Sequence, residues 1–126
     1  MKGKNIVMIA GISGALAVGV GAFGAHGLEP LLIQNGRLDT FETAVSYHFY
    51  HTLGLLGLGI LALIKPEWKG LSLAAWGMFL GVLIFSGSLY ILSLTGITWL
   101  GAITPVGGVG FILGWLALVY VMIKNN

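Results

Sequence analysis

The longest uncharged stretch of the chain constrains the fold more than any other feature. Residues 70–123 are 54 consecutive positions without Asp, Glu, Lys, Arg or His. One α-helix of that length would extend about 80 Å, whereas the hydrocarbon core of a bilayer is about 30 Å thick. The stretch must therefore reverse direction. The best turn lies at 94–98 (LTGIT), because Thr95-Gly96 interrupts a helix and Trp99 suits a membrane interface.

Two further apolar stretches bring the number of predicted spans to four. Residues 6–25 contain no ionisable side chain over 20 positions, and residues 43–64 contain only His48 and His51 over 22. A membrane-spanning helix needs about 20 such residues. We therefore expect one all-α domain, residues 1–126, folded as an antiparallel four-helix bundle in the membrane. The predicted helices cover 5–25, 41–64, 71–94 and 99–123, with an outer loop at 26–40.

The composition supports a membrane protein and argues against a soluble one. Only 8% of the residues are charged, 57% are hydrophobic, and the mean hydropathy is +0.98. A soluble domain carries charge on roughly a quarter of its residues. The basic pI of 9.1 rests on very few charges, so we expect membrane lipids rather than nucleic acid as partners. The chain has no cysteine, which excludes disulfides and thiolate-bound clusters.

The positions of the basic residues predict the orientation of the bundle. Five lysines precede the first helix, lie between the second and third helices, or follow the fourth, and only Arg37 falls on the opposite side. Basic residues accumulate in cytoplasmic segments, so both termini are expected in the cytoplasm. A cleaved signal peptide is the alternative for residues 1–25. Phe23 argues against it, because it occupies a position before the cleavage site where a small residue is needed.

Small residues recur on one face of three predicted helices, which indicates close helix packing. In lipid, helices associate where Gly, Ala and Ser let their backbones approach. The first helix carries bulky residues on its other face, which we assign to lipid: Ile9, Ile12, Leu16, Val20 and Phe23. The small faces comprise Ala10, Gly14, Ala17, Gly21 and Ala25; Gly77, Gly81 and Ser88; and Gly107, Gly110, Gly114 and Ala117. They pack within one chain or, alternatively, build a homo-oligomer.

Pro105 lies about one turn into the fourth predicted helix. A proline in a helix interior removes a backbone hydrogen bond and kinks the helix, whereas one in the first turn is tolerated. We expect a continuous helix over 99–123 with a kink at Pro105. The alternative is a separate interfacial piece over 99–104.

The four-helix topology gathers polar side chains on the outer, non-cytoplasmic side. His26 and Glu29 end the first helix there, and Asp39 and Glu42 begin the second. Glu42 follows Asp39 by three residues, so a capping-box role is the first interpretation of this pair. The other polar residues expected in this half are His48, His51, Ser86, Ser88, Tyr90, Ser93 and Thr104.

The two histidines of the second helix have three interpretations. As metal ligands they lack partners, because Glu42 lies on the far side of the helix from His51, so we expect no metal site. A neutral buried histidine bonded to a neighbouring Ser, Tyr or carbonyl avoids an unsatisfied polar group in hydrocarbon. The third interpretation is functional, since ionisable residues at membrane depth often mark ligand sites or proton relays.

Four segments of the chain resemble the YwdK/YgdD-like family of small bacterial membrane proteins, which has a mitochondrial relative in animals. They are GAFGAHGL (21–28), ETAVSYHFYHTLGLL (42–56), FSGSLYILSLTG (85–96) and GAITPVGGVGFILGW (101–115). The resemblance implies four transmembrane helices and a bacterial plasma-membrane location, and it carries no established activity.

The resemblance also selects residues. Those that fall on typical family positions are His26, Glu42, Tyr47, His51, Ser86, Ser88, Tyr90 and Pro105. His48 departs from the pattern, because the family often has Gln there, which leaves His26 and His51 as the preferred pair. We take this set, apart from Pro105, as the candidate polar site.

Two non-enzymatic functions fit the sequence better than an enzyme does. We expect a non-enzymatic module that binds a lipid, a quinone-like molecule or another membrane protein in a polar crevice of the outer half. The alternative is permeation of protons or a small solute through an oligomer, with His26, Glu42 and His51 as a relay. An intramembrane enzyme is disfavoured, because the chain has no GxSxG or HExxH motif. No catalytic residue and no cofactor is assigned.

Overall fold

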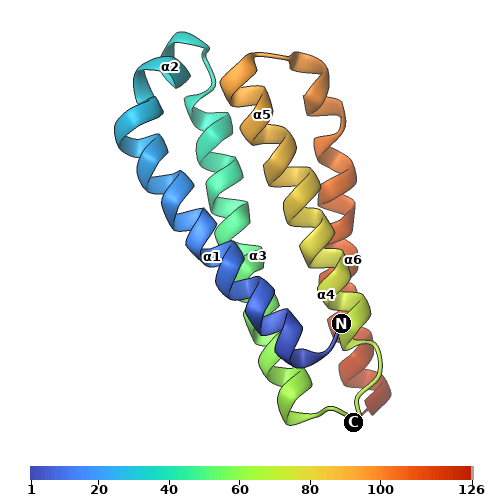
Figure 1. Cartoon of the computed structure of the whole chain (residues 1–126). Helices are drawn as coiled ribbons and strands as arrows, with labels where there is room; N and C mark the ends of the chain where they lie inside the picture. The colour runs from blue at the N-terminus through green and yellow to red at the C-terminus, as the bar shows by residue number, and fades with distance from the viewer. Residues whose placement is uncertain (126) are drawn as a thin grey trace.

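Four long helical segments run antiparallel in the computed structural model, which describes residues 1–125 (Figure 1). The first two segments contain α1 (Gly3–Phe23), a π-helical turn η1 (Gly24–Leu28), α2 (Glu29–Gln34) and α3 (Leu38–Ile64). The remaining elements are α4 (Leu71–Gly81), a second π-helical turn η2 (Val82–Ser86), α5 (Gly87–Thr95), a 3-10 turn η3 (Thr98–Ala102) and α6 (Thr104–Asn125).

The lengths of these segments match a bilayer. All four segments are long and apolar enough to span it, and the shortest, Leu71–Thr95, has 25 residues. At 1.5 Å per residue that segment is about 38 Å long, enough to cross the hydrocarbon core. The predicted all-α four-helix membrane fold is therefore confirmed. Because the number of spans is even, both termini lie at one end of the bundle, called here the terminal end, and α2 lies at the other, the α2 end (Figure 1).

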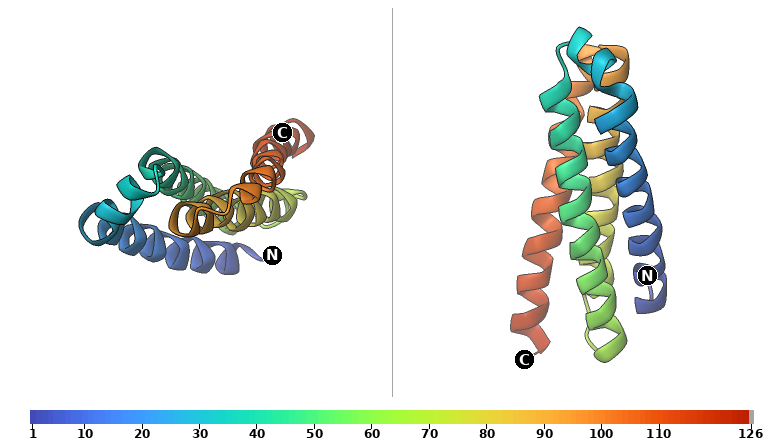
Figure 2. Two further views of the ribbon diagram at one scale, coloured as in Figure 1. Left: turned by 90° about the horizontal axis from the view of Figure 1, so that it is seen from above. Right: turned by 90° about the vertical axis from the view of Figure 1, so that its left-hand side faces the viewer.

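The helices pack in the order α1, α3, α4–α5, α6. α1 packs mainly on α3, and α6 packs on α4 and η2, so α1 and α6 lie on opposite flanks (Figure 2). The buried side chains form two clusters. One contains Ile6, Leu55 and Met78 in the terminal half, and the other contains Ala44, Leu89 and Leu92 near the α2 end.

The predicted division of the first helix into a small face and a bulky face is confirmed in part, because Ala25 is exposed and Ile9 packs against the core. Ala10 and Ala17 are buried, whereas Ile12 and Leu16 are 62% and 58% exposed on the surface that would meet lipid. The α4–α6 contact is closer still. A Cβ on Gly77 would lie 3.0 Å from the carbonyl oxygen of Gly110, so the two backbones touch without intervening side chains.

The expected outer loop at 26–40 is largely helical, which corrects the sequence prediction. Helical structure continues past Ala25 through η1 and α2 to Gln34, and only residues 35–37 connect it to α3. Pro30 favours this continuation because it occupies the first turn of α2, where no backbone donor is needed. The chain then reverses at Gly36, which has a φ of +65°. The capping-box interpretation was wrong: α3 begins at Leu38, after Arg37, and no side chain caps it.

The start of the fourth segment also differs from the expectation. The turn at 94–98 is confirmed, since α5 ends at Thr95 and Gly96 adopts a φ of +74°. The kink predicted at Pro105 is absent, however, because Thr98–Ala102 forms the separate turn η3 and α6 begins at Thr104. Pro105 thus lies in the first turn of α6, where its missing N–H breaks no helical hydrogen bond.

Candidate functional site

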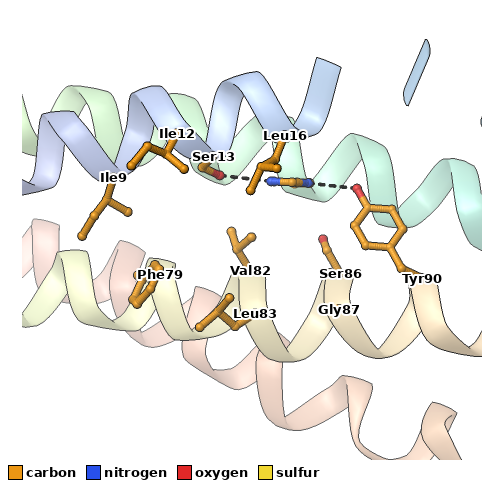
Figure 3. Close-up of a pocket in the computed structure, with 11 residues that line it drawn as sticks. Ile9, Ile12, Ser13, Leu16, Phe79, Val82, Leu83, Ser86, Gly87 and Tyr90 are labelled. Carbon is orange, nitrogen blue, oxygen red and sulfur yellow. Dashed lines mark hydrogen bonds between the residues drawn. The ribbon is translucent and has the colours of Figure 1, made fainter. Parts of the chain in front are cut away.

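A chain of four hydrogen-bonded side chains joins three helices near the middle of the bundle. His48 of α3 bonds to α1 and to α5, with Nε2 3.0 Å from Ser13 Oγ and Nδ1 2.9 Å from the Tyr90 hydroxyl. Ser13 and Tyr90 are labelled in Figure 3, where dashed lines mark these hydrogen bonds. Ser13 Oγ is in turn 2.6 Å from Thr52 Oγ1, one turn further along α3. His48 and Thr52 are both buried. Each polar group therefore has a partner in a region where water is excluded.

The imidazole of His48 can form its hydrogen bonds to Ser13 and Tyr90 in two ways. A neutral histidine has one donor and one acceptor nitrogen. In one arrangement Tyr90 donates to Nδ1, while Nε2–H donates to Ser13. In the other, Ser13 donates to Nε2, while Nδ1–H donates to the Tyr90 oxygen. The hydroxyl of Tyr90 has its proton free in the second arrangement and only lone pairs free in the first. The Tyr90 hydroxyl, at one end of the hydrogen-bonded side chains, can thus act as either a donor or an acceptor toward a further group.

A crevice of about 390 Å³ lies beside this chain, between α1 and the η2–α5 segment (Figure 3). Ser13, His48 and Tyr90 contribute to its lining, and Ser86 adds a fourth polar residue. The other lining side chains are apolar: Ile9, Ile12, Leu16, Phe79, Val82 and Leu83. Ile12, Leu16 and Leu83 are more than half exposed, which places the opening on the lipid-facing flank of the bundle. We call this space the α1–η2 crevice.

The π-helical turn η2 shapes the floor of the crevice. Ser86 is completely buried, and its hydroxyl donates to the Ala44 carbonyl of α3 at 2.8 Å, which anchors η2 to that helix. Gly87 follows directly, and a Cβ placed on it would meet no atom within 4 Å. The absence of a side chain at Gly87 therefore leaves part of the crevice volume open.

His51 belongs to a different environment from His48. Its ring stacks on Phe111 of α6, with centroids 3.5 Å apart and an interplanar angle of 11°. Nδ1 lies 2.8 Å from the Tyr47 carbonyl, and Nε2 accepts from the Trp115 indole at 3.2 Å. Because an indole can only donate, Nε2 must be unprotonated and Nδ1 must carry the hydrogen. His51 is thus a neutral residue that joins α3 to α6.

The structure distributes the predicted site residues over several places. Ser86 and Tyr90 line the α1–η2 crevice. Ser88 is buried and pairs with Thr104 Oγ1 at 2.6 Å, and Tyr47 stacks on Phe85 with ring centroids 4.6 Å apart. The structure does not bring the preferred pair together, because His26 is exposed in η1 at the α2 end while His51 faces α6.

Glu42 lies in a second cavity, at the α2 end. This cavity has a volume of about 430 Å³ and is also lined by Glu29 and Ser46. It is separate from the α1–η2 crevice, because the two share no lining residue. Within residues 1–125, no group of three or more His, Cys, Asp or Glu side chains is placed to hold a metal ion.

Sequence reasoning missed the residues at the centre of the polar chain. It set His48 aside, and it did not select Ser13 or Thr52. It also missed Trp115, which bonds to His51 outside this polar chain. Two signals were available. Ser13 lies on the face of α1 that also carries Ala10 and Ala17, so it had to point toward another helix. His48 and Thr52 are separated by four residues, which places them on one face of α3.

Four apolar helices with a hydrogen-bonded polar chain and a crevice open to lipid define a polytopic membrane protein with a candidate ligand site between its helices. Residues 20–108 match the family model described as "Protein of unknown function (DUF423)", and the chain belongs to this family. The resemblance found in the four sequence segments is thereby confirmed.

The relatives match over nearly the whole chain. The chain is 48% identical over 121 residues to the UPF0382 membrane protein YwdK of Bacillus subtilis, covering 96% of this chain and 98% of the relative. A UPF0382 membrane protein of Staphylococcus saprophyticus is 49% identical over 92% of this chain and 94% of its own. One from Haemophilus influenzae is 37% identical over 100% and 98%. No solved structure matches the chain.

Proposed function

We propose that this protein is a non-enzymatic membrane module that binds a quinone-like molecule in the α1–η2 crevice. The observation that carries the proposal is the position of the His48–Tyr90 pair in the wall of an apolar crevice that opens toward lipid. A ligand with a small polar head and an apolar tail would enter from the bilayer. Its tail would remain among acyl chains beside Ile12 and Leu16.

The size and lining of the crevice support this class of ligand. Small-molecule sites commonly have volumes of about 300–1,000 Å³ and combine apolar walls with few polar groups. The crevice has about 390 Å³ and meets both conditions. That volume accommodates a ring-sized head group but not a whole lipid. A polar head at this depth needs a hydrogen-bonding partner, because unpaired polar groups in hydrocarbon cost several kcal/mol.

The two arrangements of the His48 chain favour a quinone over other apolar ligands. A quinone carbonyl accepts a hydrogen bond, which the Tyr90 hydroxyl donates when His48 holds its hydrogen on Nδ1. A quinol hydroxyl donates, and Tyr90 accepts when the hydrogen is on Nε2. The same wall therefore suits both redox forms of one molecule.

The surroundings of Ser13 support the non-enzymatic part of the proposal. Ser13 and His48 are 3.0 Å apart, a separation also found between a nucleophile and its base. Acyl transfer additionally needs donors that stabilise an oxyanion. Ser13 lies in the middle of α1, where the nearby backbone N–H groups bond to carbonyls of the preceding turn. They are not free to stabilise a reaction intermediate.

A binding measurement with a cavity-filling variant tests the proposal. Purified protein in lipid nanodiscs is titrated with menadione and with a short-tailed benzoquinone. Gly87→Leu should abolish binding, because its Cβ meets no atom within 4 Å and the side chain beyond it would occupy the crevice that Gly87 lines. Gly11→Leu is the matched control, since its Cβ also meets nothing within 4 Å and Gly11 does not line the crevice. Equal binding by both variants, or no binding by the wild type, would contradict the proposal.

We further propose that the protein lies in the bacterial cytoplasmic membrane with both termini in the cytoplasm. The membrane assignment of the relatives supports the location. The orientation is supported by five of the six basic residues, which lie at the terminal end, because positively charged segments are retained on the cytoplasmic side.

A second candidate function is proton permeation through an oligomer, and the titratable imidazole within a hydrogen-bonded chain favours it. His48→Gln separates the two candidates. Glutamine keeps a donor and an acceptor at this position but cannot exchange a proton. Proton flux into proteoliposomes that is lost in this variant, while quinone binding is kept, would support permeation. Unchanged flux would exclude His48 as a relay.

A further inference from the structure

A third cavity lies at the terminal end of the bundle, and several positively charged side chains line it. Its volume is about 630 Å³, and it lies between the first residues of α1 and the connection from α3 to α4. Four of its lining residues are lysines: Lys2, Lys4, Lys65 and Lys69. The remaining lining includes Trp68 and the hydroxyl-bearing Ser72. We call this space the lysine cavity.

The fold brings lysines from two distant parts of the sequence to this place. A Cβ on Gly3 would lie 2.9 Å from the backbone nitrogen of Leu63, so the start of α1 packs directly on the last turn of α3. Lys2 and Lys4 are therefore held next to the α3–α4 connection. That connection turns at Gly70, which has a φ of +100°, and Lys65 Nζ lies 5.9 Å from the centroid of the Trp68 ring.

The charge of this region is strongly unbalanced. The terminal end carries five of the six basic residues, and Glu67 is its only acidic residue. Glu67 does not line the lysine cavity. The four lysine ammonium groups and the amino group of Met1, which donates to Ser72 Oγ, repel each other around this cavity unless an anion is present between them. The chain itself supplies no carboxylate to the lining, so a suitable anion must come from outside.

We infer that the lysine cavity binds the phosphate group of an anionic phospholipid. The helices cross the bilayer, so their terminal ends lie at the level of the lipid head groups. Basic pockets between transmembrane helices recognise anionic head groups at this level. Leu63 belongs to the same lining and is exposed, so it offers apolar contact to the first acyl carbons. Trp68, in the same cavity, is a residue type enriched at membrane interfaces.

Native mass spectrometry of protein released from nanodiscs tests this inference. The nanodiscs contain phosphatidylcholine with a minor fraction of phosphatidylglycerol. Wild-type protein should retain phosphatidylglycerol in preference to phosphatidylcholine. Lys65→Gln/Lys69→Gln should retain it about 25-fold less, because each lysine near an anionic head group contributes about a fivefold factor. Circular dichroism should show unchanged helix content, since both side chains are exposed.

A charge-matched variant separates a built site from general attraction. Arg37→Gln/Lys124→Gln also removes two positive charges, and neither residue lines the cavity. This control should retain phosphatidylglycerol like the wild type. Equal loss in both double variants would overturn the inference. Displacement of the lipid by excess inorganic phosphate would overturn the lipid as the source and leave a soluble phosphate as the ligand, whereas resistance to phosphate supports the lipid.

Discussion

His48 is central to the polar chain because its two nitrogens reach α1 and α5 from α3. Replacing it with alanine leaves the Ser13 and Tyr90 hydroxyls without their shared partner. Hydrogen bonds between membrane helices are worth about 0.6–2 kcal/mol each. We expect His48→Ala to lower the free energy of unfolding by about 1–2 kcal/mol, measured by reversible denaturation in mixed micelles and followed by circular dichroism.

His48→Gln is the matched comparison for this prediction. The amide supplies a donor and an acceptor, so it can bond both hydroxyls as the imidazole does. The loss of unfolding free energy should therefore be less than half of that in His48→Ala. Equal losses in the two variants would show that the volume of the ring matters rather than its hydrogen bonds.

His51 is fixed in one tautomer by its neighbours, and this leads to a spectroscopic prediction. The Tyr47 carbonyl can only accept, and the Trp115 indole can only donate. We expect nitrogen-15 spectra of the reconstituted protein to show His51 neutral, with hydrogen on Nδ1. In Trp115→Phe the Nε2 acceptor loses its partner, so its nitrogen shift should move. A signal from a protonated Nε2 in the wild type would contradict the structure.

The two histidines show how far the polar site could be predicted from the sequence. That both would be buried and bonded to neighbours follows from the cost of bare polar groups in lipid, and the structure has them so. Which neighbours they meet depends on the rotation of α3 against α1 and α6. Small residues of α3 set that rotation, such as Gly59 against Val7 of α1 and Gly54 against Trp115 of α6. Sequence spacing within one helix does not contain this information, so the sequence left open whether His26 and His51 meet, and the structure keeps them apart.

Two adjacent glycines in α6 offer a test of the packing of α6 on η2. A Cβ on Gly107 would collide with the backbone nitrogen of Phe85, whereas one on Gly108 would lie 3.8 Å from the Phe85 side chain. Gly107→Ala must therefore push α6 away from η2. We expect it to cost about 1–3 kcal/mol of unfolding free energy, the range typical of overpacked cores.

Gly108→Ala is the control for this prediction, because an ordinary van der Waals contact costs little. Its free energy of unfolding should remain within about 0.5 kcal/mol of the wild type. Thermal unfolding in micelles compares the two variants directly. If both alanines were tolerated equally, the helices would not be packed as closely as the structure has them.

The helical segments themselves were predictable to different degrees. Residues 41–64 and 71–94 were placed to within a few residues, because long apolar runs bounded by charge or by Thr95-Gly96 have few alternatives. The helical residues 26–34 were missed, since their polar character and Pro30 are also typical of a loop. The π-helical turns left no signal in the apolar pattern. One of them, η2, positions Ser86 and leads into Gly87, so the crevice floor could not be predicted.

The even number of helices and the distribution of lysines together support the proposed topology. Four spans return the chain to the end where it began, which fixes both termini on one side (Figure 1). The even number alone leaves both orientations open. The lysines favour the cytoplasmic side for the terminal end, because its segments carry Lys2, Lys4, Lys65, Lys69 and Lys124 against Arg37 at the α2 end.

Single cysteines test this topology without background, because the natural chain contains none. Gln34→Cys, at the end of α2, should react with a membrane-impermeant maleimide in intact bacteria, since the proposed orientation places it outside. Glu67→Cys and Lys124→Cys should react only after the membrane is permeabilised. Each change keeps at least four of the five lysines at the terminal end, so the orienting charge persists. Reaction of Lys124→Cys but not Glu67→Cys in intact cells would contradict the four-span fold. Reaction of both with Gln34→Cys protected would keep the fold and reverse its orientation.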